Sequence, residues 1–474
     1  MKICIISDIH LPYSKNDVKY KALDKYLSDA VKNRVDMIIC PGDFTANGDI
    51  DAAKYFLAKI NETGIPYAVT AGNSDLRNKE TRDEILQLAC PCLSSKIITL
   101  NDYDRNISEA EFEVLDKAED GALVTMHHPY TILHSPSKEK FAVWRQKHPD
   151  TIVMNAHLHK YEIKGNDISL PCADPDKNIG DEPWVMIYDT ESGSILKNHF
   201  ECPMPDFFKD YIGISCYKPF EDIPYARLHN LKHIELRPSA VSENRERLKS
   251  ELELWRKECG EILSLHAPDI IPDENGIVNK DKWKDFTEFA HDVDAQRITL
   301  HVPKCSLKNY PFFKSLILEF LAERFEELPD NCIIGIENMH MTAKDSPDET
   351  RRFGYTPDEV KDFMTAVKAI TNKQVGINLD IGHARNNAPY SERFTLGAWY
   401  AEVGKLTVNY HIHQVTSENG VFTNHAPLTS SYGKLISLAS FYRGLSDGTL
   451  NIAPIILEIR DKKYKESIEW LENK

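Results

Sequence analysis

The sequence predicts a two-domain α/β protein whose second domain is a (β/α)8 barrel. The chain has 474 residues, and at ~100–200 residues per domain this length corresponds to two domains or more. The first part alternates short apolar runs with amphipathic segments, and residues 206–474 contain eight such runs, each followed by a longer helical or loop segment. Eight strand–helix units match a closed barrel, which needs ~250 residues. An open, doubly wound sheet is the alternative, but eight successive units favour closure.

In residues 1–205, short apolar runs mark the expected strands. They are Lys2–Ser7, Met37–Cys40, Tyr67–Thr70, Lys96–Leu100, Leu123–Met126 and Thr151–Asn155. Apolar residues at helical spacing predict a helix over Lys19–Lys32. Two runs around a glycine-containing turn predict a hairpin over residues 184–200. The stretch CPMPDF at residues 202–207 has two prolines and no periodicity, so we expect domains at 1–205 and 206–474.

The apolar runs of the second domain define the expected barrel strands. They are Tyr211–Cys216, His233–Leu236, Ile262–His266, Arg297–His301, Cys332–Glu337, Val375–Asp380, Thr407–His413 and Ala453–Ile459. Parallel neighbours need a crossover of a dozen residues or more between them, usually a helix. The segments between these runs therefore predict the outer helices of the barrel.

Composition and charge exclude several classes of protein. Hydrophobic residues make up 42% of the chain and charged residues 27%, which is typical of a globular protein and not of a disordered or fibrous one. The formal net charge is −16, and both halves carry an excess of acidic residues. Such a surface disfavours non-specific binding of duplex nucleic acid, whereas small anionic substrates held by metals remain compatible with it.

The cysteines and the N-terminus indicate a cytoplasmic protein. Ten cysteines are scattered along the chain, and the one close pair, Cys90 and Cys92, lacks the two-residue spacing of a redox or zinc pair. The N-terminus shows no basic segment followed by an apolar one. There is no run of about 18 apolar residues that could span a membrane. We therefore expect free thiols in a reducing cytoplasm.

Side chains that can bind metals follow the strands of the first domain. They are Asp8, His10, Asp43, Asn73, His127, His157 and His159. Each alone would more often be a polar turn residue, but five blocks in this order favour a metal site. Carboxylate, imidazole and amide ligands suit Mn, Fe or Zn better than calcium. One carboxylate shared by two ions ~3.5–4 Å apart is the arrangement that holds the attacking and leaving oxygens in phosphoryl transfer.

The blocks SDIH, GDFTANG, GNSD, HHP and AHLH resemble the calcineurin-like metallophosphoesterase superfamily over about residues 1–200. The resemblance implies an α/β sandwich that hydrolyses a phosphomonoester or phosphodiester by two-metal hydroxide attack. The ligands implied for one ion are Asp8, His10, Asp43 and His159. Those implied for the other are Asp43, Asn73, His127 and His157. Asp43 would bridge the ions, and the residues implied to be catalytic are Asp43, Asn73 and His127.

The first domain departs from this family's pattern at two positions. The usual asparagine–histidine–aspartate block reads Asn73-Ser74-Asp75, and the missing histidine normally steadies the phosphate and protonates the leaving oxygen. General acid catalysis contributes ~10²–10⁴-fold, so we expect esters with poor leaving groups to react slowly. His128 is a candidate substitute acid, although a packed or solvent-facing histidine is the stronger interpretation. Ala156 replaces a glycine, which is a mild change.

A second set of polar residues lies at the carboxyl ends of the expected barrel strands, where barrel enzymes carry their active sites. They are His266, His301, Glu337, Asp380, His383, His411, His413, His425 and Glu458. A single histidine at a strand end usually has a structural role. Six consecutive strands that end in histidine or carboxylate predict metal binding.

This series resembles the xylose isomerase-like barrel superfamily, and most closely its endonuclease IV-type members, over about residues 210–460. The first implied ion would be held by His266, His301 and Glu337. The second would be held by Glu337, Asp380, His413 and Glu458. A third would include His383 and His425. Spacing does not separate His411 from His413, since both share a strand face, and we choose His413 by its motif position.

The third implied ion lacks a carboxylate, because the family's Asp-x-His motif reads Thr423-Asn424-His425 here. The sugar isomerase and epimerase branch of the superfamily needs only one metal. Its implied ligands are Glu337, Asp380, His413 and Glu458. Glu337 and Glu458 would then shuttle protons. The additional histidines favour a phosphoester-processing barrel over an isomerase, and a barrel kept for binding or scaffolding is the third alternative.

Together these patterns predict a bifunctional metal-dependent hydrolase. We expect two ions of Mn, Fe or Zn in the first domain and one to three ions of Zn or Mn in the barrel, where Glu337 and Glu458 would be catalytic. The expected substrate is a small anionic phosphoester, with a nucleotide or a nucleic-acid end as candidates. The alternatives are a phosphatase fused to a sugar-phosphate isomerase or epimerase, and a first domain that is a decayed binding module.

Overall fold

The computed structural model of the chain describes residues 1–178, 182–241, 244–342, 345, 350–418, 421–429 and 437–473. The chain divides into two compact units. They are Met1–Pro203 with Ser437–Arg443, and Met204–Ile436 with Gly444–Lys474. Among the described helices, none combines the length and the hydropathy that a bilayer span requires.

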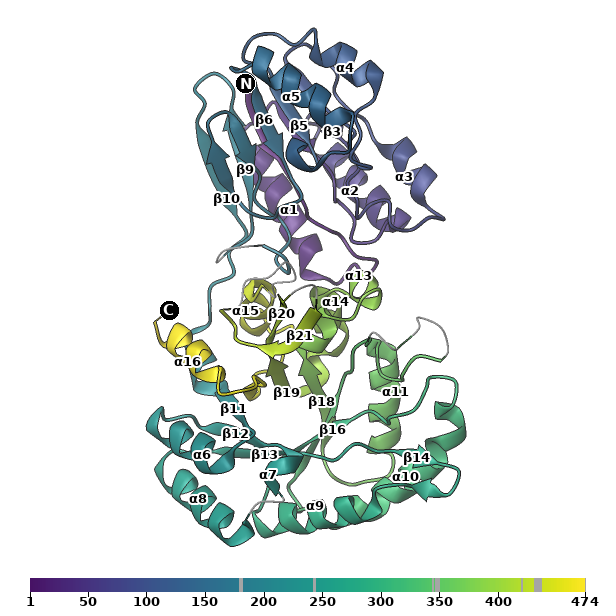
Figure 1. Ribbon diagram of the computed structural model, residues 1–474, viewed down its shortest axis with the longest axis vertical. Coiled ribbons are helices and arrows are strands. Elements are labelled where there is room, and N and C mark those ends of the chain that lie inside the picture. The colour runs from purple at the N-terminus through teal and green to yellow at the C-terminus, as the bar shows by residue number, and fades with distance from the viewer. Residues whose placement is uncertain are drawn as a thin grey trace. The chain divides into compact units, whose positions relative to one another are not determined.

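The first unit contains two five-stranded sheets (Figure 1). One sheet has the order β10 (Ile195–His199), β9 (Trp184–Asp189), β1 (Lys2–Ile5), β2 (Met37–Cys40) and β3 (Tyr67–Val69). The other has the order β4 (Ile97–Thr99), β5 (Leu123–Met126), β6 (Ile152–Asn155), β8 (Asp167–Ser169) and β7 (Glu162–Lys164). The six expected strands and the β9–β10 hairpin are confirmed, whereas β7 and β8 were not predicted.

Helices cover the outer faces of these sheets, and apolar side chains fill the space between them. The helices are α1 (Val18–Lys32), α2 (Ile50–Glu62), α3 (Arg82–Leu88), α4 (Glu109–Leu115) and α5 (Ser137–Lys147), with the short η1 (Tyr130–Ile132). Because side chains alternate along a strand, Ile3 and Ile5 face the second sheet, whereas Cys4 packs with α1 and α2. Phe112 of α4 and Phe141 of α5 pack on the second sheet. The predicted α/β sandwich is confirmed.

Eight parallel strands of the second unit close into a barrel. In order around the barrel they are β11 (Ile212–Cys216), β12 (His233–Leu236), β13 (Ile262–His266), β16 (Arg297–His301), β17 (Ile333–Glu337), β18 (Val375–Asp380), β19 (Thr407–Ile412) and β22 (Ile455–Leu457). All eight expected strands are confirmed within two residues at either end. Two small antiparallel pairs were not predicted. They are β14 (Pro272–Asp273) with β15 (Gly276–Ile277), and β20 (Gln414–Glu418) with β21 (Val421–Ala426).

The helices after residue 205 alternate with the barrel strands, as a parallel barrel requires. The α-helices are α6 (Pro219–Leu228), α7 (Pro238–Val241), α8 (Arg245–Glu258), α9 (Lys280–Asp292), α10 (Tyr310–Glu326), α11 (Pro357–Lys368), α12 (Ile381–Arg385), α13 (Tyr390–Arg393), α14 (Leu396–Val403), α15 (Ala439–Ser446) and α16 (Tyr464–Glu472). The short 3₁₀ helices are η2 (Asp206–Tyr211) and η3 (Gly404–Leu406).

Strand register brings the polar strand ends of the barrel to one rim. His301 at the end of β16 pairs with Glu337 at the end of β17. Asp380 at the end of β18 pairs with His411 of β19. Because all eight strands run parallel, these carboxyl ends meet at the same end of the barrel.

A lysine is completely buried in the first unit. Lys19, at the start of α1, has its Nζ 2.9 Å from Asp174 Oδ2 and 3.1 Å from Asp176 Oδ2, and all three residues are buried. Burial alone would lower the pKa of Lys19, but the two aspartates outweigh it and raise the pKa. The lysine therefore stays charged and balances two buried carboxylates.

We expect Lys19→Met to lower the free energy of unfolding by about 3–5 kcal/mol, because removal of one partner leaves buried charges uncompensated. Lys32→Met is the matched control on the same helix: Lys32 is 71% exposed and lies 3.1 Å from Asp29, so its loss should cost less than about 1 kcal/mol. Urea denaturation of both variants measures the difference. Equal losses would contradict the assignment of Lys19 as the balancing charge.

Candidate metal centres

Asp43 lies at the centre of the polar site in the first unit. It follows β2, and each of its carboxylate oxygens faces a different histidine: Oδ2 is 3.2 Å from His10 Nε2, and Oδ1 is 3.6 Å from His127 Nε2. Asp43 is buried. Burial alone would raise its pKa, but His127 and His10 hold the pKa well below its usual range. The carboxylate is therefore ionised and available to two cations at once.

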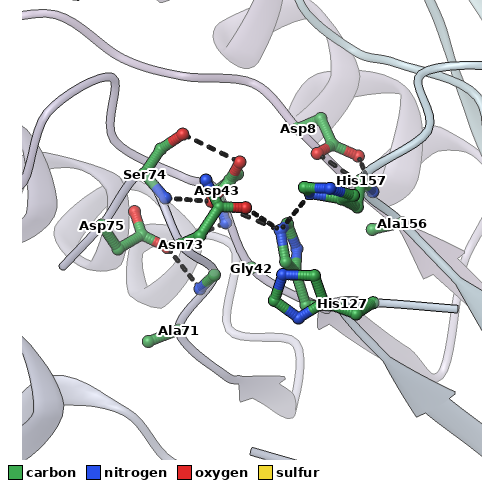
Figure 2. A network of polar contacts seen from close by, with 12 residues as sticks. Asp8, Gly42, Asp43, Ala71, Asn73, Ser74, Asp75, His127, Ala156 and His157 are labelled. Atoms are coloured by element: carbon green, nitrogen blue, oxygen red, sulfur yellow. Dashed lines mark hydrogen bonds and ion pairs between the residues drawn. The ribbon is translucent and has the colours of Figure 1, made fainter. Parts of the chain in front are cut away.

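Figure 2 shows four other predicted ligands near Asp43: Asn73, His127, His157 and, next to His157, Asp8. His127 Nε2 is 3.0 Å from Asn73 Oδ1 and 3.3 Å from His157 Nδ1. His159 Nε2 is 3.4 Å from Asp8 Oδ1. Burial and the charge of His127 lower the pKa of His157 to about 4. His157 is therefore neutral near pH 7, and neutral imidazole is the form in which histidine binds metals.

The seven predicted residues are thus brought together, and this placement requires strained backbone conformations. Five of them have left-handed backbone conformations, with φ of 53° at Asp8, 47° at His10, 54° at Asp43, 69° at His157 and 55° at His159. Such conformations cost of order 1–3 kcal/mol each and concentrate at functional sites. Gly72 permits the tight packing, because a Cβ there would lie 2.2 Å from Asp43 Oδ1.

Ser74, which replaces the family's histidine, holds the central carboxylate. Its backbone N donates to Asp43 Oδ1 at 2.7 Å, and its Oγ donates to Asp43 Oδ2 at 2.9 Å. Asp75 fixes the same loop, because it accepts from the backbone N of Asp43 and of Gly72, each at 2.8 Å. Burial and the nearby charge of Asp43 raise the pKa of Asp75 to about 8.

His128 is buried and held by Asp102. Its backbone N donates to Asp102 Oδ2 at 2.8 Å, and its Nδ1 lies 3.2 Å from the same oxygen. Its ring also packs against His157, with ring centroids 4.6 Å apart. These contacts favour the packed interpretation of His128 over that of a substitute acid.

Two residues next to the first site were not predicted. Asp174 Oδ2, which pairs with Lys19, is also 3.2 Å from His10 Nδ1. Cys172 donates from Sγ to the carbonyl of Asp8 at 3.3 Å and forms a possible metal-binding group with His10 and His159. The only signal in the sequence is that both residues follow an apolar run that ends at Leu170.

In the barrel, Glu337 is the central side chain. Its Oε2 is 3.4 Å from His266 Nε2 and 3.5 Å from His301 Nε2. Its Oε1 is 3.4 Å from His411 Nδ1 and 3.5 Å from His383 Nδ1. Burial alone would raise the pKa of Glu337, but His411 and His301 hold it well below its usual range. Like Asp43, it is a buried, ionised carboxylate between two sets of imidazoles.

The structure places His411, rather than the His413 chosen by motif position, beside Glu337 and Glu458. His411 Nδ1 is 3.0 Å from Glu458 Oε2, and His411 forms a four-membered possible metal-binding group with Glu337, Asp380 and Glu458. His413 Nε2 contacts Asp380 Oδ1 at 3.3 Å. Both histidines are buried on one strand face, and only the register of β19 against its neighbours separates their surroundings.

His413 instead joins the group predicted for a third ion, with His383 and His425. His340, which the sequence analysis missed, adjoins this group: its ring stacks on His383 at 4.4 Å, and its Nε2 lies 2.9 Å from Asn424 Nδ2. Burial and the charge of His383 lower the pKa of His340 to about 3. Side-chain carboxylates reach the third group through Asp380, Glu337 and Glu458.

The barrel residues fit divalent cations. Seven buried atoms at this rim lie close to one another but lack the geometry of a hydrogen bond with any described residue: His266 Nε2, Glu337 Oε1, Glu337 Oε2, Asp380 Oδ2, His411 Nδ1, His413 Nε2 and Glu458 Oε2. Buried polar atoms without hydrogen bonds are rare and need an explanation such as an ion. Imidazole nitrogens and carboxylate oxygens together suit Zn or Mn.

Further side chains fix the orientation of these ligands. Glu235 of β12 lies 3.1 Å from His411 Nε2 and accepts from Thr299 Oγ1 at 2.6 Å. Arg237 Nη1 donates to Glu458 Oε1 at 2.6 Å. Partners of this kind set the tautomer and orientation of metal ligands. Neither residue was predicted, because both lie on or directly after β12, a strand that carries no candidate metal ligand.

Comparison with known proteins identifies both units. The model of the calcineurin-like phosphoesterase family matches residues 1–161, and that of the xylose isomerase-like TIM barrel family matches residues 224–474. The chain belongs to the xylose isomerase-like TIM barrel family and carries a calcineurin-like phosphoesterase domain N-terminal to the barrel in sequence. It is therefore a two-domain, metal-dependent enzyme, since both families typically use divalent metals.

Solved structures resemble each unit at low identity. A D-tagatose 3-epimerase-like protein is 20% identical, over 56% of this chain and 96% of its own, with a TM-score of 0.37. Endonuclease IV from Thermus thermophilus is 14% identical, over 56% and 100%, with a TM-score of 0.39. A dimetal phosphatase from Danio rerio is 11% identical, over 42% and 99%, with a TM-score of 0.30. Comparison with curated proteins gives no match.

We expect Asp174→Asn to weaken metal binding by the first unit about 10–100-fold, the usual effect of removing a carboxylate that orients a ligating histidine. Asp176→Asn is the matched control, because Asp176 also pairs with Lys19 and the substitution removes the same charge. Metal content at buffered free-metal concentrations, measured by mass spectrometry, gives the affinities. Equal effects of the two variants would indicate that the charge matters and the contact with His10 does not.

We expect Glu337→Gln to remove twice as many ions from the barrel as Glu458→Gln. Glu337 contacts two sets of candidate ligands, whereas Glu458 contacts His411 and the edge of the third group. Metal content per chain, corrected for the ions of the first unit in an Asp43→Asn background, checks this ratio. An equal loss in the two variants would show that Glu337 does not bridge.

Proposed function

We propose that the chain is a bifunctional metal-dependent hydrolase. The first unit hydrolyses a phosphomonoester or phosphodiester, and the barrel acts on a phosphoester of a nucleotide or a nucleic-acid end. The observation that carries the proposal is the Asp43 carboxylate, whose two oxygens lie 3.2 Å from His10 and 3.6 Å from His127. This is the geometry that a carboxylate needs to be shared by two cations.

In the first unit, two divalent cations would supply Lewis-acid charge to the phosphoryl group and lower the pKa of water. Asp8, His10, Asp43 and their partners hold the ligand atoms in place before substrate binds. Ser74 keeps the Asp43 carboxylate in a fixed orientation through two hydrogen bonds. Since Ser74 is turned toward Asp43 and His128 toward Asp102, neither supplies a proton to the leaving oxygen, and esters with good leaving groups are the favoured substrates.

In the barrel, the contacts of Glu337 with His266 and His301 support a centre with more than one ion. Two cations about a shared carboxylate suit displacement at phosphorus, where attacking and leaving oxygens both need compensation. Arg237 adds a fixed positive charge beside Glu458. The multinuclear ligand set is what favours a phosphoester over an unphosphorylated sugar.

The second candidate function is a sugar-phosphate isomerase or epimerase barrel fused to a phosphatase. It is favoured by the compact group of Glu337, Asp380, His411 and Glu458, whose ligand atoms lie within 4.8 Å of one another. This is a complete single-metal set with two glutamates that could move a proton. The contacts of His266 and His301 with Glu337 have no role in that function, and they are the reason for ranking it second.

A decayed first domain is the third candidate. The hydrogen bonds of Ser74 to Asp43 speak against it, because the substitution keeps the ligand geometry intact.

We also propose a cytoplasmic location and a small anionic substrate. All ten cysteines are free, as a reducing compartment requires, and the net charge of −16 disfavours long polyanions.

Separate substitutions test the two sites. We expect Asp43→Asn to reduce hydrolysis of bis(p-nitrophenyl) phosphate about 10²–10³-fold, the loss typical of removing one electrostatic element of a transition state, whereas Glu337→Gln leaves this reaction unchanged. Residual phosphoester cleavage that persists in Asp43→Asn and disappears in the double variant Asp43→Asn/Glu337→Gln would belong to the barrel.

Two results would contradict the proposal. Hydrolysis of bis(p-nitrophenyl) phosphate at the wild-type rate in Asp43→Asn would show that the first unit is not the phosphoesterase. Exchange of a carbon-bound proton of a ketose phosphate into heavy water, dependent on Glu337 and independent of Asp43, would establish the isomerase.

A further inference from the structure

A cavity of about 540 Å³ opens beside the first histidine pair of the barrel. Its lining includes His266 and His301, which both contact Glu337, and three basic residues, Arg237, Arg245 and Lys282. This volume lies within the ~300–1,000 Å³ of small-molecule sites. The cavity therefore leads from the candidate metal centre to a group of positive charges.

Two of these charges have no ion-pair partner among the described residues. Arg237 is paired with Glu458, but Arg245 is held by neutral groups: its Nη2 donates to the carbonyl of Asp285 at 3.1 Å, and its guanidinium lies 5.7 Å from the centre of the Phe289 ring. Within the described part of the chain, no carboxylate lies within ion-pair distance of Arg245 or Lys282. They converge on the cavity from different helices, α8 and α9.

The two carboxylates that line the cavity do not cancel this charge. Asp269 uses both oxygens elsewhere, since Oδ1 is 2.8 Å from His301 Nδ1 and Oδ2 is 3.3 Å from Lys304 Nζ. The carboxylate of Asp285 is exposed, and it is one negative charge beside the two positive charges of Arg245 and Lys282. On a chain with a net charge of −16, a cavity with excess positive charge at a candidate active site favours a small anionic ligand.

We propose that this cavity binds the phosphate group of a small phosphate monoester, with Arg245 and Lys282 as its ligands. The rest of such a molecule would extend toward His266 and His301, past the apolar Phe286 and Ile271 and the polar Asn279 and Asp285, which suit the carbon and hydroxyl groups of a sugar. The inference deepens the proposed function and rests on it for the barrel as the place of reaction. A sugar phosphate and a nucleoside monophosphate share the chemistry that the cavity recognises.

The test compares two double variants of the full chain. Arg245→Gln/Lys282→Gln removes the two cavity cations. Arg247→Gln/Lys284→Gln removes the same charge from the same two helices at residues that do not line the cavity. The probes are D-arabinitol 5-phosphate, which has no carbonyl group to isomerise, its neutral counterpart D-arabinitol, adenosine monophosphate, and a duplex oligonucleotide with one abasic site. Amide hydrogen exchange of residues 279–286 at increasing probe concentration reports binding at the cavity alone, separately from binding by the first unit.

We expect the cavity variant to bind the phosphorylated probes at least about ten-fold more weakly than the wild type, since a hydrogen bond to a charged group contributes enough for such a factor. The control variant should bind like the wild type, and D-arabinitol should not distinguish the two. The monoester that protects residues 279–286 at the lower concentration is the better ligand, which separates D-arabinitol 5-phosphate from adenosine monophosphate.

Three outcomes would overturn the proposal: equal binding of the monoesters by both variants, no protection of residues 279–286 by any monoester, or charge-dependent protection by the abasic duplex alone. Binding does not require turnover. Charge-dependent binding of the monoesters without phosphoester cleavage would therefore refute the proposed function and leave this inference standing. Phosphoester cleavage without such binding would refute this inference and leave the proposed function standing.

Discussion

Buried carboxylates need nearby positive charge, and both units are organised around this constraint. An ionised carboxylate taken out of water costs several kcal/mol unless it is paired. Lys19 balances Asp174 and Asp176, and Arg237 balances one oxygen of Glu458. Among the described residues, no lysine or arginine lies within ion-pair distance of Asp43 or Glu337, and imidazoles contact both carboxylates. At these two positions the histidines supply the compensating charge, and a bound cation would replace it.

The two units meet this constraint with different backbones. In the barrel, most candidate ligands stand on regular strand ends, so parallel pairing alone sets their spacing, as between His301 and Glu337. In the first unit, the ligands stand on loops after the strands, and Asp8, His10 and Asp43 adopt left-handed conformations. The barrel site is therefore a property of strand register, whereas the first site depends on individual turns and on the small size of Gly72.

The sequence was sufficient for those features that are local. Apolar runs predicted all eight barrel strands, and the polar residue at the end of each run predicted most of the rim. It was insufficient where the deciding contact joins distant segments. Asp174 reaches His10 from far along the chain, and Glu235 reaches His411 across the barrel. Spacing could not separate His411 from His413 for the same reason, because both histidines share a strand face and only the neighbouring strands distinguish their surroundings.

The left-handed turns of the first unit link cation supply to folding. Five strained residues together store several kcal/mol by the usual cost per residue, a sizeable share of the ~5–15 kcal/mol that stabilises a typical domain. Cations that bind only the folded state raise the free energy of unfolding by mass action and so offset this strain. The metal-depleted first unit would then be the form most exposed to proteolysis, and the supply of metal in the cell would set how much of the enzyme survives as well as how fast it works.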